Sequence, residues 1–335
     1  MEEMTGRERY QAILRGEETD RPAAITVVSV ATEESCSELG IRFEETHLCA
    51  DKMAALSSYI HTELGFDSVM PYYSVVQEAA ALGGDINWGD GETMPYQNGR
   101  CYGEPEEFRM PEDFLDRLPI KTVLDSIRLL KKKHGDTAVI TGKAMGPWTL
   151  TMRLYGLEDL LVDSLLEPDK IKAFMGRFVE ITKKFVQAQL EAGADLVTIA
   201  DHTTSNLVSP QTYVEFAQPL HQELNRLVPG KLVLHCCGNT MDRISHFKDG
   251  GFPVFHFESS NDIREALRLA RPMKLAGCIN NPDVLLAGSP ETVDREVRRI
   301  VDAGIRLISP ECAVPLQTKN ANMAQIVKTL KTYSK

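Results

Sequence analysis

The chain of 335 residues lacks any apolar run near the roughly 20 residues that a membrane-spanning helix needs. Its seven cysteines are an odd number spread over a long chain, which favours free thiols or metal ligands over a disulfide framework. The chain also lacks a net positive charge, since 48 acidic residues outnumber 37 Lys and Arg and give a net charge of −11, and this argues against a nucleic-acid partner. The first residues are acidic and lack the basic-then-apolar pattern of a signal peptide. We therefore expect a cytoplasmic protein without a membrane or nucleic-acid partner.

Eight short apolar runs alternate with longer amphipathic segments. Runs that are apolar throughout are typical of strands buried on both faces of a parallel sheet. The runs cover 24–30, 67–70, 138–144, 195–200, 232–236, 253–257, 273–278 and 306–309. Helical patterns over 168–192, 210–227 and 290–303 lie between them, and Ser209 and Ser289 stand as N-caps before first-turn prolines. This alternation predicts an α/β fold, a (β/α)₈ TIM barrel.

A doubly wound open sheet is the alternative fold. However, no glycine-rich phosphate loop follows the first run, which continues into Ala31-Thr32-Glu33-Glu34, and this weakens a dinucleotide-binding interpretation. The segment 72–118 is glycine-rich with few apolar pairs, so we interpret it as an insertion near the barrel mouth. No linker or low-complexity segment interrupts the chain. We therefore predict one domain over 1–335, with an N-terminal helical extension that opens with a capping box at Thr5–Glu8.

Residues able to do chemistry follow five of the predicted strands. In a TIM barrel the carboxyl ends of the strands meet at one rim, where active sites lie. Here this rim would hold Asp201 and His202, then 235–238, 256–258, 278–281 and 309–312. The sequence therefore predicts that cysteines, histidines and carboxylates converge at the barrel mouth.

Three of these residues make a candidate metal site. His235 and Cys237 are two positions apart on a strand, so both side chains can face one metal ion while Cys236 points away. Cys312 would join them from another strand end. One nitrogen and two sulfur donors suit zinc and leave a fourth position open, where a bound thiol would become a nucleophile. For each cysteine alone, the alternative is a small buried apolar residue.

The stretch 234–239, Leu-His-Cys-Cys-Gly-Asn, together with Cys312, resembles the His-x-Cys…Cys zinc motif of methylcobamide:coenzyme M methyltransferases in the uroporphyrinogen decarboxylase superfamily. The resemblance covers nearly the whole chain, including the Gly-Pro-x-Thr-Leu pattern at 146–150. It implies a barrel of that family with zinc on His235, Cys237 and Cys312. It also implies transfer of a methyl group from a methylated corrinoid protein to a thiol such as coenzyme M.

One further candidate rests on the resemblance, and the others rest on their place at the predicted strand ends. Glu258 aligns with a family glutamate that can complete the zinc shell, with a rim carboxylate as the alternative. We expect Asp201 to orient a metal ligand or contact the acceptor, or else to cap a helix or loop. Pocket-lining candidates are Tyr72, His202, His256 and Asn280, for which structural roles are the alternative.

Other activities remain open at this point. Uroporphyrinogen decarboxylases carry an Arg-Gln-Ala-Gly-Arg motif after the first strand, and 28–34 lacks those arginines, which argues against decarboxylation. A relative could instead demethylate a small methylated substrate and load the corrinoid. A non-catalytic module that binds a corrinoid protein is a third possibility. Because the chain has no Asp-x-His-x-x-Gly cobalamin-binding motif, we expect the methylcobamide to arrive on a separate protein.

Overall fold

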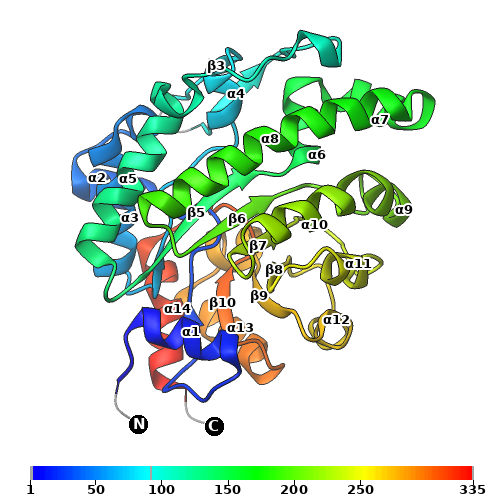
Figure 1. Cartoon of the computed structure of the whole chain (residues 1–335). Helices are drawn as coiled ribbons and strands as arrows, with labels where there is room; N and C mark the ends of the chain where they lie inside the picture. Colours follow the sequence, from blue (N-terminus) through cyan, green and yellow to red (C-terminus); the bar gives the residue numbers. More distant parts are fainter. Residues whose placement is uncertain (1–2, 91–92, 334–335) are drawn as a thin grey trace.

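An eight-stranded parallel sheet curls into a barrel in the computed structural model, which describes residues 3–90 and 93–333 (Figure 1). The strands follow the order β1-β10-β9-β8-β7-β6-β5-β2. They are β1 (Ala23–Ala24), β2 (Ser68–Val69), β5 (Val139–Met145), β6 (Leu196–Ala200), β7 (Leu232–His235), β8 (Val254–His256), β9 (Lys274–Ile279) and β10 (Leu307–Pro310). Neighbouring barrel strands follow one another along the chain and helices cover the outside, so the predicted TIM barrel is confirmed and the doubly wound sheet is wrong.

The two end strands of the sheet, β1 and β2, meet at a seam that closes the barrel. The Asp67 backbone amide donates to the Ala24 carbonyl at 2.7 Å, and the Ala24 amide donates to the Asp67 carboxylate at 2.8 Å. Two residues further on, the Thr26 amide donates to the Ser68 hydroxyl at 2.5 Å. The predicted first strand over 24–30 is therefore too long, because the backbone amide of Thr26 bonds a side chain and not a neighbouring strand. The other seven strands lie within one residue of their predicted bounds.

Helices surround the barrel and connect its strands (Figure 1). They are α1 (Gly6–Arg15), α2 (Glu33–Leu39), α3 (Ala50–Thr62), α4 (Gln77–Ala81), α5 (Leu118–His134), α6 (Pro147–Leu154), α7 (Leu157–Leu166), α8 (Pro168–Ala192), α9 (Pro210–Thr212), α10 (Gln218–Leu227), α11 (Ile244–Asp249), α12 (Ile263–Ala270), α13 (Pro290–Asp302) and α14 (Asn320–Thr332). Short 3₁₀ or π helices are η1 (Phe43–Leu48), η2 (Pro105–Glu107), η3 (Phe114–Asp116), η4 (Tyr213–Ala217) and η5 (Asn281–Leu286). The capping box at Thr5–Glu8 and the N-caps Ser209 and Ser289 are confirmed.

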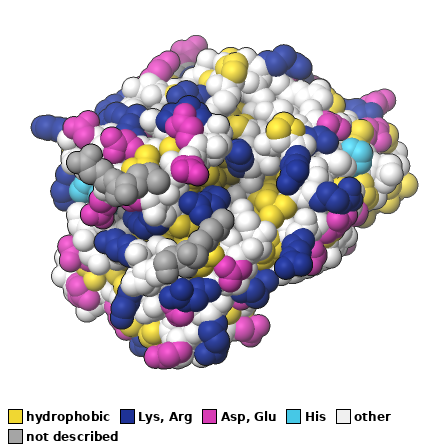
Figure 2. All heavy atoms as spheres, turned by 90° about the horizontal axis from the view of Figure 1, so that it is seen from below, with side chains coloured by type: hydrophobic (Ala, Val, Ile, Leu, Met, Phe, Trp, Pro, Cys, Tyr) yellow, Lys and Arg dark blue, Asp and Glu magenta, His cyan; other side chains and the backbone are white. Residues whose placement is uncertain are grey.

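Helix α1 covers the amino-terminal end of the barrel. Its Tyr10 and Ile13 are buried against Val139, Val233 and Leu307, which come from three strands. This apolar plug fills the lumen from below, so the barrel is a packed core and is not a pore. Figure 2, a view from below, shows Lys, Arg, Asp and Glu side chains intermingled around apolar atoms at this end.

The predicted insertion over 72–118 contains α4, the hairpin of β3 (Asp85–Asn87) and β4 (Tyr96–Asn98), η2 and η3. The Cys101 amide donates to the Leu154 carbonyl at 2.8 Å, which ties the segment to the end of α6. Residues 91–92 of this segment lie outside the described residues, as do 1–2 and 334–335 of the predicted domain. The single-domain assignment stays a prediction. Within residues 3–90 and 93–333, none of the helices has the length and hydropathy to cross a bilayer.

Candidate metal centre at the barrel mouth

The structure brings His235, Cys237 and Cys312 together at the carboxyl ends of β7 and β10. The two sulfur atoms are 3.1 Å apart, and the Cys237 sulfur is 3.1 Å from His235 Nε2. The Cys312 sulfur is 3.8 Å from the same nitrogen. Donors bound to one tetrahedral zinc at about 2.0–2.3 Å lie roughly 3–4 Å from each other. The three atoms therefore fit a shared metal ion.

A hydrogen bond between two tilted histidine rings sets the orientation of His235. His256 Nε2 lies 2.8 Å from the Pro310 carbonyl, which can only accept, so this nitrogen carries the proton. Its Nδ1 is then an acceptor and receives the Nδ1–H of His235 across 2.8 Å. His235 Nε2 is left without a proton and faces the two thiols. The donor chain thus fixes the tautomer that a metal-binding imidazole requires.

Burial keeps both of these rings neutral. His235 is 4% exposed and His256 is fully buried. Burial and repulsion by His256 and His202 lower the pKa of His235 well below its usual value. Burial also lowers the pKa of His256 to about 4, against the opposing effect of the Pro310 carbonyl. Neutral imidazole is the form that binds metal ions.

The two cysteine thiols differ in how easily they lose a proton. Hydrogen bonding to Cys312 and burial raise the pKa of the Cys237 thiol well above its usual value. The hydrogen bond that Cys237 supplies lowers the pKa of Cys312 in turn. The thiolate that forms first is therefore stabilised by a hydrogen bond from the other thiol.

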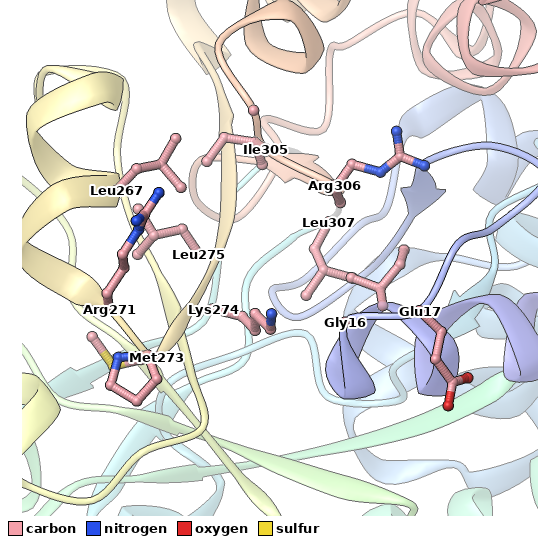
Figure 3. A pocket seen from close by; sticks show the side chains of 13 residues that line it. Gly16, Glu17, Leu267, Arg271, Met273, Lys274, Leu275, Ile305, Arg306 and Leu307 are labelled. Atoms are coloured by element: carbon pink, nitrogen blue, oxygen red, sulfur yellow. The ribbon is translucent and has the colours of Figure 1, made fainter.

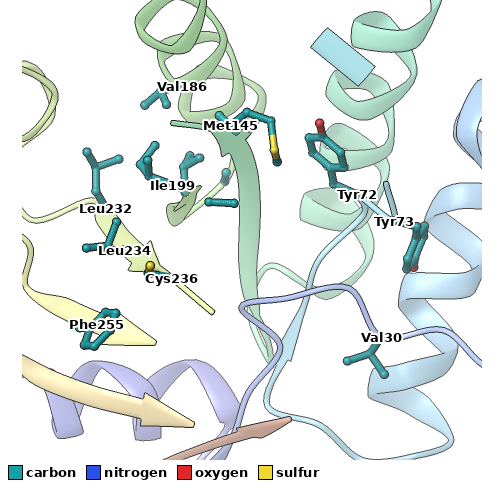
Figure 4. Packing of buried hydrophobic residues seen from close by; sticks show 14 of the residues in the cluster. Val30, Tyr72, Tyr73, Met145, Val186, Ile199, Leu232, Leu234, Cys236 and Phe255 are labelled. Atoms are coloured by element: carbon teal, nitrogen blue, oxygen red, sulfur yellow. The ribbon is translucent and has the colours of Figure 1, made fainter. Parts of the chain in front are cut away.

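Cys236 lies on the other face of the strand. Its side chain is fully buried in the apolar core beside Leu234 and Phe255, between the barrel and its helices (Figure 4). Burial raises the pKa of its thiol to about 12. The structure thus places Cys236 where the strand alternation predicted, away from His235 and Cys237.

A second donor set overlaps the first. The ligand atoms of His202, His235 and Cys237 all lie within 4.8 Å of one another, and His202 Nε2 is 3.8 Å from the Cys237 sulfur. We favour His235, Cys237 and Cys312 as the main donors, because Cys312 is closer to Cys237 and two thiolates suit zinc. His202 is then a further potential donor beside these three residues.

Comparisons with known proteins assign the family. The family model described as Uroporphyrinogen decarboxylase (URO-D) matches residues 5–333. The chain belongs to the uroporphyrinogen decarboxylase family. Within it, the chain is 28% identical to a methylcobamide:CoM methyltransferase MtbA from Methanosarcina acetivorans, over 99% of both sequences. It is 24% identical to a methylated-thiol–coenzyme M methyltransferase from Methanosarcina mazei, over 98% of this chain and 90% of the relative.

A solved structure supports the same family assignment. The chain superimposes on a methyltransferase from Methanosarcina mazei with a TM-score of 0.93, at 26% identity and over 98% of each chain. The relative named methylcobamide:CoM methyltransferase thus matches over 99% of its length, and the expected resemblance is confirmed.

Asp201 positions the helix beside the metal centre in this uroporphyrinogen decarboxylase family member. Its fully buried carboxylate accepts from the Thr149 amide at 2.7 Å and from His221 Nε2 at 2.8 Å. It thereby caps the start of α6. Gly146 is required here, because a Cβ at that position would stand 2.3 Å from the carboxylate carbon of Asp201. The Gly-Pro-x-Thr-Leu pattern thus serves this contact, and a catalytic role for Asp201 stays a prediction.

The remaining candidates are spread around the rim. Glu258 is partly exposed, accepts from the Ser260 hydroxyl at 3.4 Å and lies within electrostatic range of both thiols. Asn280 caps η5 by accepting from the Asp283 amide at 2.7 Å. Tyr72 is fully buried, with its hydroxyl donating to Glu78, so it does not face the thiols directly. Binding roles for these residues remain predictions.

Two residues that hold Cys312 in place were not predicted. Glu311 accepts from the amides of Ser259 and Asn281, both at 2.9 Å, and so joins the ends of β8, β9 and β10. The amide group of Asn281 donates to the Cys312 carbonyl at 3.0 Å. The signal in the sequence is Glu311, a carboxylate directly before the candidate metal-binding residue Cys312. The signal did not reveal the role, because the amides that bond Glu311 come from distant segments.

A cavity of about 480 Å³ lies far from this centre, at the amino-terminal end of β9 and β10 (Figure 3). Its wall combines apolar side chains such as Leu267 and Leu307 with Arg271 and Lys274. None of the candidate metal-binding residues lines this cavity. The chemistry-bearing residues instead gather at the opposite end, where Cys237, Cys312 and His202 are partly exposed.

Proposed function

We propose that this protein is a zinc-dependent corrinoid methyltransferase that moves a methyl group between a corrinoid on a partner protein and a small thiol such as coenzyme M. The observation that carries the proposal is the meeting of two cysteine sulfurs and one unprotonated imidazole nitrogen at the barrel mouth. Full-length similarity to methylcobamide:CoM methyltransferases supports the reaction type. The lack of a cobalamin-binding motif in this chain supports a carrier in trans.

His235, Cys237 and Cys312 would hold the zinc. When bound, zinc lowers the pKa of a coordinated thiol so that the sulfur is a nucleophile at neutral pH. His256 keeps His235 Nε2 free of a proton, and the Pro310 carbonyl holds His256. His202 and Glu258 flank the open side, where the acceptor enters.

The proposed reaction is a displacement at carbon. The cobalt–carbon bond of the methylated corrinoid breaks, a carbon–sulfur bond forms, and the corrinoid leaves with the electron pair as cob(I)amide. The thiol proton is released to solvent through the partly exposed rim. The protein contributes orientation and activation, which are the terms that lower the barrier for such a transfer.

The reverse assignment is the second candidate. A relative over 98% of this chain is named for methyl transfer from methylated thiols to coenzyme M, which favours a role in demethylating a small methylated thiol. In that direction the same residues would hold the sulfur of the substrate while the corrinoid accepts the methyl group.

The test is methyl transfer with free methylcobalamin. We expect zinc-loaded protein plus 2-mercaptoethanesulfonate to convert methylcobalamin to its demethylated form, followed by absorbance, with the methyl thioether detected by mass spectrometry. Cys312→Ala abolishes this turnover, and Cys236→Ala retains it as the matched control. Incubating methylated thiols with cob(I)alamin tests the second candidate. Absence of methyl transfer in both directions from zinc-loaded protein would overturn the proposed function and favour a non-catalytic binding module.

A further inference from the structure

The cavity at the amino-terminal end of the barrel lies where the strands β9 and β10 part (Figure 3). The first residue of β9 that pairs with β10 is Ala276, opposite Leu307, so Lys274 and Leu275 extend beyond the paired region. The end of α1 supplies another wall. The enclosed volume of about 480 Å³ is within the range of roughly 300–1,000 Å³ that is typical of small-molecule sites.

Apolar side chains line the interior of this cavity. Ile13 and Leu307 belong to the apolar plug at the foot of the barrel lumen. Leu275 and Ile305 belong to the larger core between the barrel and its helices, and Leu267 of α12 packs against that core while it stays partly exposed. Contact with these side chains favours a ligand with an apolar body, because such a body leaves water on binding.

Lys274 places an amine in this cavity without a partner. Ala276 lies in the lumen plug, and strand alternation puts Lys274 on the same inward face of β9. The Lys274 side chain is partly buried, and a Cβ on Gly16 would stand 3.8 Å from its Nζ, which locates the amine at the end of α1. Within residues 3–90 and 93–333, no group forms a hydrogen bond or an ion pair with this amine.

Two arginines add positive charge to the wall. Arg271 is exposed and forms no ion pair or hydrogen bond with any residue that the structure describes. Arg306 donates to the Thr19 hydroxyl at 3.0 Å, and burial lowers the pKa of its guanidinium. Among the described residues that line the cavity, the one carboxylate is Glu17, whose two oxygens already accept from Arg15 at 2.7 Å. The wall thus presents three cations and no free carboxylate to balance them.

Other cations at this end of the barrel do have carboxylate partners. Arg7 pairs with Asp195 at 2.6 Å, and Arg21 pairs with Asp67 at 2.8 Å. A cation that is already paired gains little from a second anion, whereas an unpaired one can form charge-assisted hydrogen bonds to an incoming ligand. The cations around the cavity therefore remain available for an anion.

We propose that this cavity binds a small amphipathic anion, a molecule that joins one carboxylate to an apolar body. Lys274 and Arg271 hold the carboxylate, and the apolar body lies against Leu267 and Leu307. The length of β10 separates this site from Cys312, which follows the carboxyl end of that strand. The inference goes beyond the proposed function and does not depend on it.

Direct binding of matched probes tests the site. We expect saturation-transfer NMR titrations to detect octanoate on wild-type protein. Binding of 1-octanol, which lacks the charge, and of acetate, which lacks the apolar body, should be weaker by at least ~10-fold. Lys274→Met and Arg271→Gln should each weaken octanoate binding about tenfold, because a hydrogen bond to a charged group contributes that much. Octanoate should also raise the Tm of wild type, since it binds the folded state.

A nearby arginine provides the control. Arg268→Gln removes an exposed arginine of α12 that pairs with Glu265 and lines no part of the cavity, so octanoate binding should stay at the wild-type level. Cys312→Ala, which alters the metal centre, should also retain binding. No binding of octanoate to wild type, equal binding of octanoate and 1-octanol, or unchanged binding in both Lys274→Met and Arg271→Gln would overturn the proposal. Binding that disappears in Cys312→Ala but persists in Arg271→Gln would place the anion at the barrel mouth and overturn it as well.

Discussion

Arg9 is a fully buried arginine and Arg153 a half-buried one with a buried Nε, at opposite ends of the same barrel, and the charges around them differ. Burial disfavours the charge on Arg9, but its ion pairs with Asp20 and Asp67, each at 2.6 Å, raise its pKa above the usual value. Arg153 forms no ion pair with any residue of 3–90 or 93–333, and burial lowers its pKa. At the amino end Arg21 also pairs with Asp67 at 2.8 Å.

The paired charged groups at the amino end stabilise the fold, whereas those at the mouth are candidates for binding a ligand. At the amino end, the carboxylates of Asp20 and Asp67 satisfy two buried arginines and close the seam between β1 and β2. At the mouth, Arg153 Nε is buried without a hydrogen-bond partner among residues 3–90 and 93–333, and Lys143 is buried with a hydroxyl and an aromatic ring beside its amine, so the burial of these cations costs free energy. Buried polar groups left without partners in this way are typical of functional sites.

The largest stability effect is expected from Asp67→Ala. This change leaves Arg9 and Arg21 buried with one carboxylate fewer, and breaking such a pair costs about 3–5 kcal/mol in the free energy of unfolding. Urea denaturation measures it. Glu17→Ala, which removes an exposed partner of Arg15, is the control and should leave the midpoint unchanged. An equal loss of stability in Asp67→Ala and Glu17→Ala would mean that the buried ion pairs at the amino end contribute no more than an exposed pair.

Lys143→Met should reveal the uncompensated charge at the mouth. Because burial lowers the pKa of Lys143 from 10.5 to about 8, the folded state binds fewer protons than the unfolded state between these pH values. The stability of wild type relative to Lys143→Met should therefore rise with pH across this window, by about 3 kcal/mol in total. Denaturation from pH 7 to 10.5 measures it. Lys172→Met should show no rise, because the pKa of Lys172 is raised by its hydrogen bond to Glu215. A flat difference for Lys143→Met would contradict the account.

His256→Leu should weaken zinc binding without removing a ligand. The Nδ1–H of His235 loses its acceptor, so the metal-binding tautomer is no longer fixed, and affinity should fall about 10–100-fold. Competition with a chromogenic chelator measures the dissociation constant. His256→Gln offers one donor and one acceptor and should restore part of the affinity. Unchanged affinity in His256→Leu would mean that the histidine pair does not orient His235.

Asp201→Ala should affect α6 and spare the metal. The first turn of the helix loses its cap, which costs about 0.5–2 kcal/mol in the free energy of unfolding, while zinc stoichiometry is retained. Thermal denaturation and metal analysis of the same sample measure both. Loss of zinc at intact stability would instead assign Asp201 to the metal centre.

Much of this arrangement could be predicted from the sequence. Apolar runs located the strands because parallel strands are buried on both faces, and strand alternation separated Cys237 from Cys236. The extent of the first strand could not be predicted, since it depends on Thr26 meeting Ser68 from another segment. For Asp201 the sequence left a helix or loop cap open as an alternative, but it could not identify α6 as the helix that is capped.

The cations at the mouth were missed, although one signal was present. Lys143 is a charged residue at an inward position of an otherwise apolar run, 138–144, and such a residue in a barrel lumen needs a reason. Arg153 carried no signal, because exposed arginines in a last helical turn are common. The pairing of His235 with His256 depends on ring orientations that spacing does not determine.

The proposed function depends on a zinc site at the barrel mouth built from His235, Cys237 and Cys312. The most direct test is elemental analysis of protein purified without chelator, comparing wild type, Cys312→Ala and Cys236→Ala. The account predicts about one zinc per chain in wild type and Cys236→Ala, and loss of zinc in Cys312→Ala with the fold intact by circular dichroism. Wild type that binds no zinc even after zinc is added, or equal loss of zinc in both variants, would contradict it.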